Sequence, residues 1–363
     1  MRSDKITNGA GAALLAFVLM TNGYSVMLGA NAGRSTWISH LLATALFFVC
    51  AVFLVRVCDA YPQKSFFGAL SAVLGRVPAK IIAAAVLIAS VATCVVSLTV
   101  FSRFVQITAL PRTPQIIIPL IIAVISALSL RVGMRALAGS ARMLVWFFAG
   151  VFLIFVLFGI KWMDAELLLP QTDNPGELLS GTGEVFLNRF GSLFAVMAIY
   201  TRMPEGKKRR FAFLTSAIGS GLALTAISAV TVATLGVNAA RSDFYPVFTV
   251  MSVRGIGGFI QHTEILACIA MTLCLFFKTA VCVMFSDDML AGILDTTQDL
   301  GAAMPIALIC AALTQIIYRD LSSLRGMVEW KTGATYVLGA YILIPVLLVL
   351  FLKSRIGKQG KTG

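Results

Sequence analysis

The sequence predicts an all-α integral membrane protein with ten transmembrane helices, arranged as a 5+5 inverted repeat in which helices 1 and 6 are broken. The chain holds ten long apolar stretches, and 59% of its residues are hydrophobic while 12% are charged. A soluble domain carries about 25% charged residues. Because the connecting loops are too short to fold separately, we expect one polytopic domain over residues 1–363, with five-helix halves at 10–160 and 184–352.

Each span is predicted from an apolar run long enough to cross a bilayer. The first follows Arg2 and Lys5; it runs for about 20 residues without a small-residue cleavage site, so we interpret it as a retained helix rather than a signal peptide. The third is long enough to tilt, and a polar stretch at 161–183 separates the halves. The spans are predicted at residues 10–30, 37–57, 79–105, 115–130, 140–160, 184–201, 211–235, 258–285, 302–318 and 333–352.

Two of the predicted spans are interrupted by polar residues and glycine. The first contains the run TNGYS at 21–25, and the sixth, which is the shortest and least apolar, contains NRFGS at 188–192. Backbone groups cannot be left bare in hydrocarbon, so unwound segments at this depth line a cavity or face a ligand. Spans 1 and 6 hold equivalent places in the two halves, which is the spacing expected of broken helices that meet at a central site.

The ligand-binding residues are therefore predicted in the two breaks. An unwound turn frees backbone N–H groups, and the positive end of the following half-helix favours a carboxylate, so an amino acid suits the site. The alternative interpretation is that the polar side chains only hold helices together and that the glycine only allows a close helix crossing. The predicted set is Asn22, Gly23, Tyr24, Ser25, Gly191 and Ser192.

Two charged residues fall inside the predicted eighth span. Glu264 and Lys278 are 14 residues apart, which is about 21 Å along a helix, so they cannot pair with each other. Charges within a membrane are functional hypotheses by default. One hypothesis pairs Glu264 with Arg103, near the outer end of the third span, as a gate or brace. Lys278 is a coupling candidate, with snorkelling to the inner interface as its alternative interpretation.

The distribution of basic residues predicts cytoplasmic N- and C-termini. The predicted loop at 286–301 is an exception, because it should lie inside yet carries four Asp and no Lys or Arg. Acidic residues count little in this rule, so the topology is kept. The basic residues assigned to the inside are Arg2, Lys5, Arg56, Lys64, Arg76, Lys80, Arg131, Arg135, Arg142, Arg202, Lys207, Lys208, Arg209, Arg210, Lys353, Arg355, Lys358 and Lys361.

Composition argues against several functional classes. The net charge of +13 comes from clusters between apolar spans, so it indicates membrane topology and a lipid bilayer rather than a nucleic-acid partner. The seven cysteines form no C-x-x-C pair and there are two histidines, so we expect no metal and no cofactor. No nucleophile, base and stabiliser can be assembled, so we expect no catalytic residues and no enzyme.

Several short runs, in order over residues 20–285, resemble the spore germination GerAB family, the B subunits of nutrient germinant receptors. Arg254, Ile256, Phe259 and Glu264, with the later Lys278, are similar to the family's helix 8 region. Residues 27–30 and 190–194 depart from the family's pattern. The other matching runs are AGRSTWIS at 32–39, YPQKS at 61–65, LGR at 74–76, KII at 80–82, LPRTP at 110–114 and LLP at 168–170.

The resemblance implies the fold of the amino acid–polyamine–organocation transporters, which is the LeuT/amino acid permease fold. It also implies a nutrient-sensing B subunit in the inner membrane of a bacterial spore, which binds a small nutrient such as an amino acid, triggers germination and works with receptor A and C subunits. Two alternatives stay open. One is a stand-alone proton- or sodium-coupled secondary transporter for an amino acid or amine, with Glu264 as a proton carrier. The other is a pore or scaffolding subunit.

Overall fold

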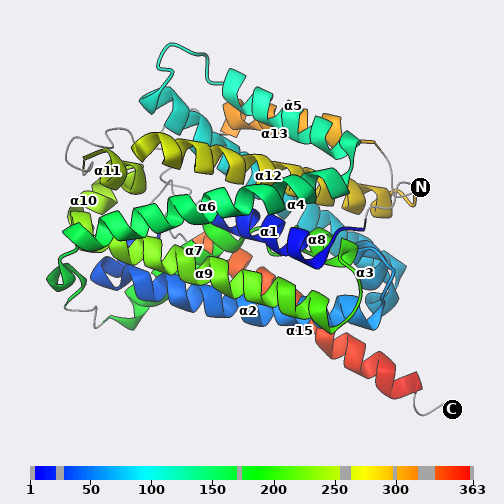
Figure 1. The fold of residues 1–363 in the computed structure, drawn as a ribbon. Helices are drawn as coiled ribbons and strands as arrows, with labels where there is room; N and C mark the ends of the chain where they lie inside the picture. Colours follow the sequence, from blue (N-terminus) through cyan, green and yellow to red (C-terminus); the bar gives the residue numbers. More distant parts are fainter. Residues whose placement is uncertain are drawn as a thin grey trace.

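The computed structural model describes residues 5–21, 28–169, 174–253, 263–296, 301–317 and 332–359, and every regular element in these ranges is a helix. The helices form one bundle and most lie along a common direction (Figure 1). Their bounds are α1 Asn8–Met20, η2 Ala30–Ser35, α2 Thr36–Ala60, α3 Phe66–Leu74, α4 Arg76–Thr108, α5 Ile117–Val132, α6 Met134–Trp162, η3 Ala165–Leu168, α7 Pro175–Phe190, α8 Met197–Arg202, α9 Lys207–Leu235, α10 Val237–Ser242, α11 Pro246–Val253, α12 Thr263–Ile293, α13 Ala303–Ile317 and α15 Thr332–Gln359.

Five stretches within these helices are long and apolar enough to cross a membrane: Ala30–Ala60, Arg76–Thr108, Met134–Leu157, Lys207–Leu235 and Ile265–Ile293. They correspond to predicted spans 2, 3, 5, 7 and 8. Helices α1, α5, α13 and α15 contain shorter apolar segments at four of the other predicted positions, and the fifth, span 6, is divided between α7 and α8. The number of spans, ten, and the division into halves at 10–160 and 184–352 stay predictions.

The outer face of α6 shows why the surface suits lipid. Met143, Trp146, Leu153 and Leu157 are all exposed, and their spacing places them along one side of the helix. The exposed fractions of Met143 and Trp146 reach 80% and 79%. A continuous apolar stripe of this length is stable only against hydrocarbon or a partner.

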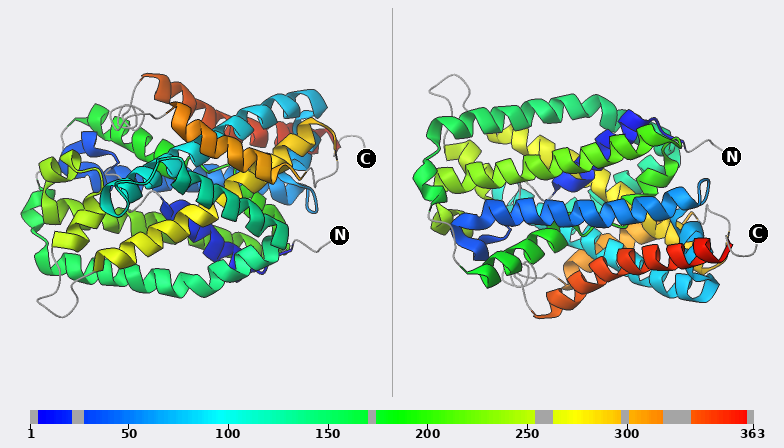
Figure 2. Two further views of the ribbon diagram at one scale, coloured as in Figure 1. Left: turned by 90° about the horizontal axis from the view of Figure 1, so that it is seen from above. Right: turned by 90° about the horizontal axis from the view of Figure 1, so that it is seen from below.

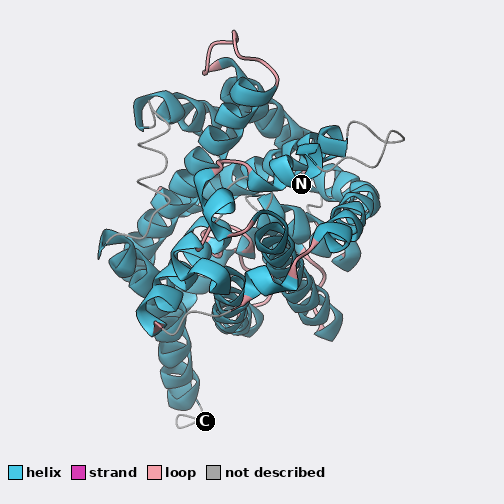
Figure 3. Ribbon diagram, turned by 90° about the vertical axis from the view of Figure 1, so that its left-hand side faces the viewer, coloured by secondary structure: helices cyan, strands magenta, loops and turns pink. Residues whose placement is uncertain are grey.

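The core forms where α1 packs against α6, α9 and α12 and where α2 packs against α7, α9 and α15. One close crossing depends on glycine: a Cβ on Gly221 of α9 would lie 2.1 Å from Cγ2 of Thr44 on α2. Viewed along the bundle, short loops join the ends of neighbouring helices (Figure 3). Small residues at crossings let membrane helices approach closely.

Helix α1 begins and α15 ends at the same end of the bundle (Figure 2). The N–H of Ile6 donates to the carbonyl of Arg202 there (3.1 Å). We call this the basic end, defined by Lys64, Arg76, Arg202 and the start of α9. The shared end agrees with the predicted even number of crossings.

The predicted acidic loop at 286–301 is wrong in its first half, because α12 continues to Ile293. Charged residues extend this helix because each carboxylate finds a partner. Asp288 pairs with Arg202, and Asp287 accepts the N–H of Ala302 (3.2 Å). A prediction from hydropathy alone ends the span at the first charged residues, because hydropathy contains no information about such pairing.

Candidate functional site

The sixth predicted span, which comprises α7 and α8 and is called helix 6 below, is broken as the sequence predicts. Helix α7 ends at Phe190, turns occupy residues 191–196, and α8 begins at Met197. Within the break, N–H groups bond three residues back: Leu193 to Phe190 (2.9 Å) and Met197 to Phe194 (3.0 Å). The whole segment is buried. The regular i−4 ladder is therefore partly replaced by i−3 bonds inside the bundle, although the N–H of Val196 still bonds the Ser192 carbonyl (3.0 Å).

Gly191 supplies a carbonyl at which three helices meet. Its oxygen accepts the Tyr341 hydroxyl of α15 (2.7 Å) and the Thr93 hydroxyl of α4 (3.3 Å). A Cβ at this position would lie 2.3 Å from the Leu187 carbonyl oxygen. Glycine is therefore required here by space, and the carbonyl is held by side chains from outside helix 6.

Next to this glycine, buried polar atoms lack partners. The Oγ of Ser192 has no hydrogen bond, and neither have Nε and Nη1 of Arg189, which is 2% exposed. Arg189 interacts electrostatically with Glu184, one and a half turns earlier on α7. Sequence reasoning treated Arg189 only as part of a polar run and passed over Glu184. The available signal was a pair of opposite charges within one short span.

Glu184 connects helix 6 to the chain that follows the first break. Its Oε1 accepts the N–H of Gly29 (3.1 Å) and its Oε2 accepts Nδ2 of Asn31 (3.3 Å). Gly29 has a φ of 76°, which favours glycine. A Cβ there would also lie 3.0 Å from Cγ2 of Val185. The far side of the first break is thus held directly against α7.

The chain just before the predicted first break is held against α12. Helix α1 ends at Met20, and Oγ1 of Thr21 donates to the carbonyl of Cys274 (3.1 Å). On the far side, Nε2 of His40 lies 3.2 Å from the Leu28 carbonyl oxygen. The predicted ligand residues Asn22, Gly23, Tyr24 and Ser25 lie outside the described residues, so their role stays a prediction.

Lys278 sits at the midpoint of α12 and is 1% exposed. Its Nζ has no hydrogen-bond partner, so the snorkelling interpretation is wrong: the ammonium is enclosed by the bundle. The side chain interacts electrostatically with Cys274 and Cys282 on its own helix, with Cys94 of α4 and with Arg189.

The predicted gate between Glu264 and Arg103 stays a prediction. The backbone of Glu264 lies in the first turn of α12, but its side chain is outside the described part of the structure. Arg103 donates from Nη1 to Oε1 of Gln106 (3.4 Å). Among the described residues, no group of three or more His, Cys, Asp or Glu is placed to hold a metal ion.

Comparison with known families identifies the chain. Residues 5–323 match the spore permease family, which is described as spore germination protein. The chain belongs to this family. The match confirms the resemblance found in the sequence. The chain is therefore an integral membrane protein and one of the germination-related permeases.

A solved structure confirms the fold of this spore permease. The chain is similar to a Na⁺-coupled sialic acid symporter solved in a substrate-bound, outward-open state, with a TM-score of 0.64 and 9% identity. The alignment covers 96% of this chain and 79% of the symporter. At this identity the likeness establishes the LeuT-like permease fold alone. A search of curated proteins finds no match.

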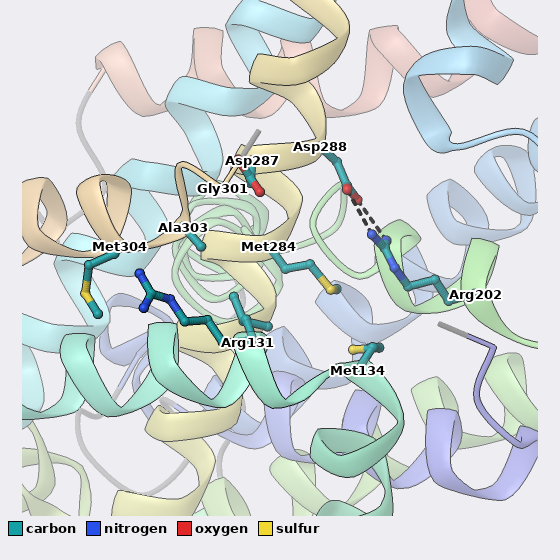
Figure 4. Close-up of a pocket in the computed structure, with 10 residues that line it drawn as sticks. Arg131, Met134, Arg202, Met284, Asp287, Asp288, Gly301, Ala303 and Met304 are labelled. Carbon is teal, nitrogen blue, oxygen red and sulfur yellow. Dashed lines mark hydrogen bonds and ion pairs between the residues drawn. The ribbon is translucent and has the colours of Figure 1, made fainter. Parts of the chain in front are cut away.

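In this permease two cavities flank one ion pair at the basic end. A cavity of about 210 Å³ is lined by Arg131, Asp287, Asp288 and Arg202, among others (Figure 4). A second, of about 360 Å³, shares Arg202 and Asp288 and also contacts Lys5. The pair is bidentate: Nη1 and Nη2 of Arg202 each lie 2.8 Å from one carboxylate oxygen of Asp288.

Proposed function

We propose that the chain is the nutrient-sensing membrane subunit, or B subunit, of a spore germinant receptor. It binds a small nutrient such as an amino acid between the helix 6 break and the segment that follows α1. The buried break at 191–196 carries this proposal, because it presents loosened backbone and an unpartnered Ser192 hydroxyl inside a permease bundle. Membership of the germination permeases supports it.

The geometry also offers a route by which binding could be read at a distance. Helix α8 joins the break to Arg202 and is six residues long, which is about 9 Å. Arg202 in turn binds Asp288 of α12. A ligand that favours one arrangement of the break therefore biases the Arg202–Asp288 contact, provided that it binds the two arrangements with different affinity.

The cellular setting follows from the same proposal. The receptor A and C subunits would read the change, in the inner membrane of the spore. The N- and C-termini would lie in the cytoplasm. Support for this orientation comes from the basic end, where Lys64, Arg76, Arg202 and the cluster at 207–210 lie at the end of the bundle at which α1 begins.

The test is a thermal-unfolding screen of the purified chain against amino acids, sugars and nucleosides. Gly191→Leu and Asn22→Leu should abolish stabilisation by the compound that binds the wild type. Gly219→Leu on α9 is the matched control, because a Cβ there would meet no atom within 4 Å. A compound that stabilises all variants equally would place its site elsewhere, and a screen without any stabilising compound would contradict nutrient binding.

A stand-alone secondary transporter is the second candidate, favoured by the likeness to the fold of a coupled symporter. Coupling would use a proton or sodium ion, with Glu264 as a proton carrier. Liposomes that contain only this chain distinguish the two functions. Accumulation of the labelled compound identified in the screen, driven by an ion gradient, would favour the transporter. Binding without accumulation would favour the sensor.

A further inference from the structure

Two cations lie in the interior of the bundle without hydrogen-bond partners on key atoms. The Nζ of Lys278 and the Nε and Nη1 of Arg189 are unpartnered, and the two residues are 1% and 2% exposed. Burying a charge without a partner is expensive, and the cost is greater where the surroundings exclude water. An arrangement of this kind persists when an outside group supplies the missing partner.

The described part of the protein does not supply that partner. Each ion pair found there lies at the basic end and involves Asp59, Asp288 or Asp295. Among the described residues, Glu184 is the carboxylate that acts on Arg189, and both of its oxygens already accept hydrogen bonds from Gly29 and Asn31. Apart from Arg189, the groups that act electrostatically on Lys278 are the thiols of Cys94, Cys274 and Cys282, whose sulfur is a weak acceptor.

Electrostatic interactions connect the two cations with each other and with residues close to the helix 6 break. Arg189 stands two residues before Gly191, and it acts electrostatically on Lys278. Cys282 interacts both with Lys278 and with Tyr341, whose hydroxyl donates to the Gly191 carbonyl. Arg189 and Ser192 thus flank Gly191 in the chain, and the Lys278 ammonium interacts electrostatically with Arg189.

We propose that Arg189 and Lys278 form a buried anion site that receives the carboxylate of the ligand. The proposal rests on the nutrient site at the helix 6 break and names its chemical class: a ligand with a carboxylate, and not an uncharged sugar or nucleoside. Arginine matches the two oxygens of a carboxylate, and lysine adds a point charge. The ligand then neutralises the charge that the described residues leave uncompensated.

Acetate tests this directly, because it carries the carboxylate and little else. Acetate in the millimolar range should raise the unfolding temperature of the purified full chain, and acetamide, its neutral analogue, should not. Lys278→Met should remove the response. Lys208→Met, at an exposed position on α9, should keep it. The proposal is overturned if acetate acts no better than acetamide, or if Lys278→Met responds as the wild type does.

Folding of the variant is checked in the same experiment. Without acetate, Lys278→Met should unfold at the wild-type temperature or above it, since replacing an unpaired buried charge by an apolar chain removes a desolvation cost. A sharp fall would show that Lys278 has a structural counter-ion and would overturn the proposal. Arg189→Gln, which keeps hydrogen-bonding capacity without charge, should weaken the acetate response as a second, independent variant.

Two further binding experiments distinguish a failure of the anion site from a failure of the proposed nutrient-sensing function. Chloride tests an inorganic source of negative charge: stabilisation by chloride and not by acetate would overturn the carboxylate assignment. Each amino acid that binds is compared with its amide. Equal binding of acid and amide would overturn the anion site while nutrient sensing stands. An acetate response without binding of any amino acid would support the anion site and count against amino acid sensing.

Discussion

Charge is concentrated in two regions of this protein, and the regions differ in how it is paired. At the basic end, carboxylates and cations meet: Asp59 with Arg209 and Arg210, and Asp288 with Arg202. In the interior of the bundle, Arg189 beside the helix 6 break and Lys278 of α12 have donor atoms without hydrogen-bond acceptors. Paired charges hold an arrangement of helices together, whereas unpaired buried charges need a partner from outside the chain.

The largest effect should come from breaking the paired region. Asp59 accepts from Arg209, Arg210 and the Tyr200 hydroxyl, and Arg209 is buried. Asp59→Ala leaves the buried Arg209 guanidinium without its counter-ion, so we expect the free energy of unfolding to fall by about 3–5 kcal/mol. Denaturant titration of the purified chain measures it. Glu205→Ala removes an exposed carboxylate at the same end and is the control. If both variants lower the free energy of unfolding by the same small amount, the paired charges of Asp59 do not stabilise the fold.

The bidentate Arg202–Asp288 pair should contribute less, because both side chains retain some solvent contact. Arg202→Gln or Asp288→Asn should each cost about 1.5–3 kcal/mol, the usual range for hydrogen bonds to charged groups. The double variant should cost less than the sum of the singles. A double-mutant cycle on unfolding measures this coupling, and strict additivity would mean that the pair does not act as a unit.

A smaller effect is expected from space rather than charge at the helix 6 break. Gly191→Ala places a methyl group against the Leu187 carbonyl and should cost about 1–3 kcal/mol through overpacking. Gly219→Ala, in open space on α9, should change stability by less than about 1 kcal/mol. Thermal unfolding of the two variants gives the comparison. Equal stabilities would show that the break can relax, and that its tight packing does not position the site.

The spans and the helix 6 break could be predicted from the sequence because they depend on local composition. A long apolar run requires a helix in hydrocarbon, and Gly191 with Ser192 marks where the sixth run is interrupted. The role of Glu184 could not be predicted in this way. Its partners, Gly29 and Asn31, are about 150 positions away, and hydropathy contains no information about such distant contacts.

The continuation of α12 was missed for the same reason. Asp287 and Asp288 look like loop residues until Arg202 is brought beside them by the fold. Lys278 was recognised as an intramembrane charge, but its distance from the interface depended on how far α12 extends. Once the helix reaches Ile293, Lys278 lies at its centre and its ammonium cannot reach the headgroups.

The smallest effect should come from the most exposed pair at the basic end, and it should depend on pH. Hydrogen bonds from Lys80 and Arg76 hold the pKa of Asp295 below its usual value. A carboxyl whose pKa is lowered by folding stabilises the protein above its unfolded pKa, about 4, and this contribution is lost as the pH falls through the lower, folded value. The wild type should therefore unfold at a slightly higher temperature than Asp295→Asn at neutral pH.

That difference should shrink below about pH 4, and added salt should reduce it at neutral pH because exposed charges are screened. Unfolding temperatures measured for both proteins across pH and salt test this. A difference that survives both acid and salt would mean that Asp295 is held by packing rather than by charge. Salt then distinguishes the two regions by mechanism: it weakens the exposed Asp295 pairs, whereas electrostatic interactions of the enclosed Lys278 are screened much less.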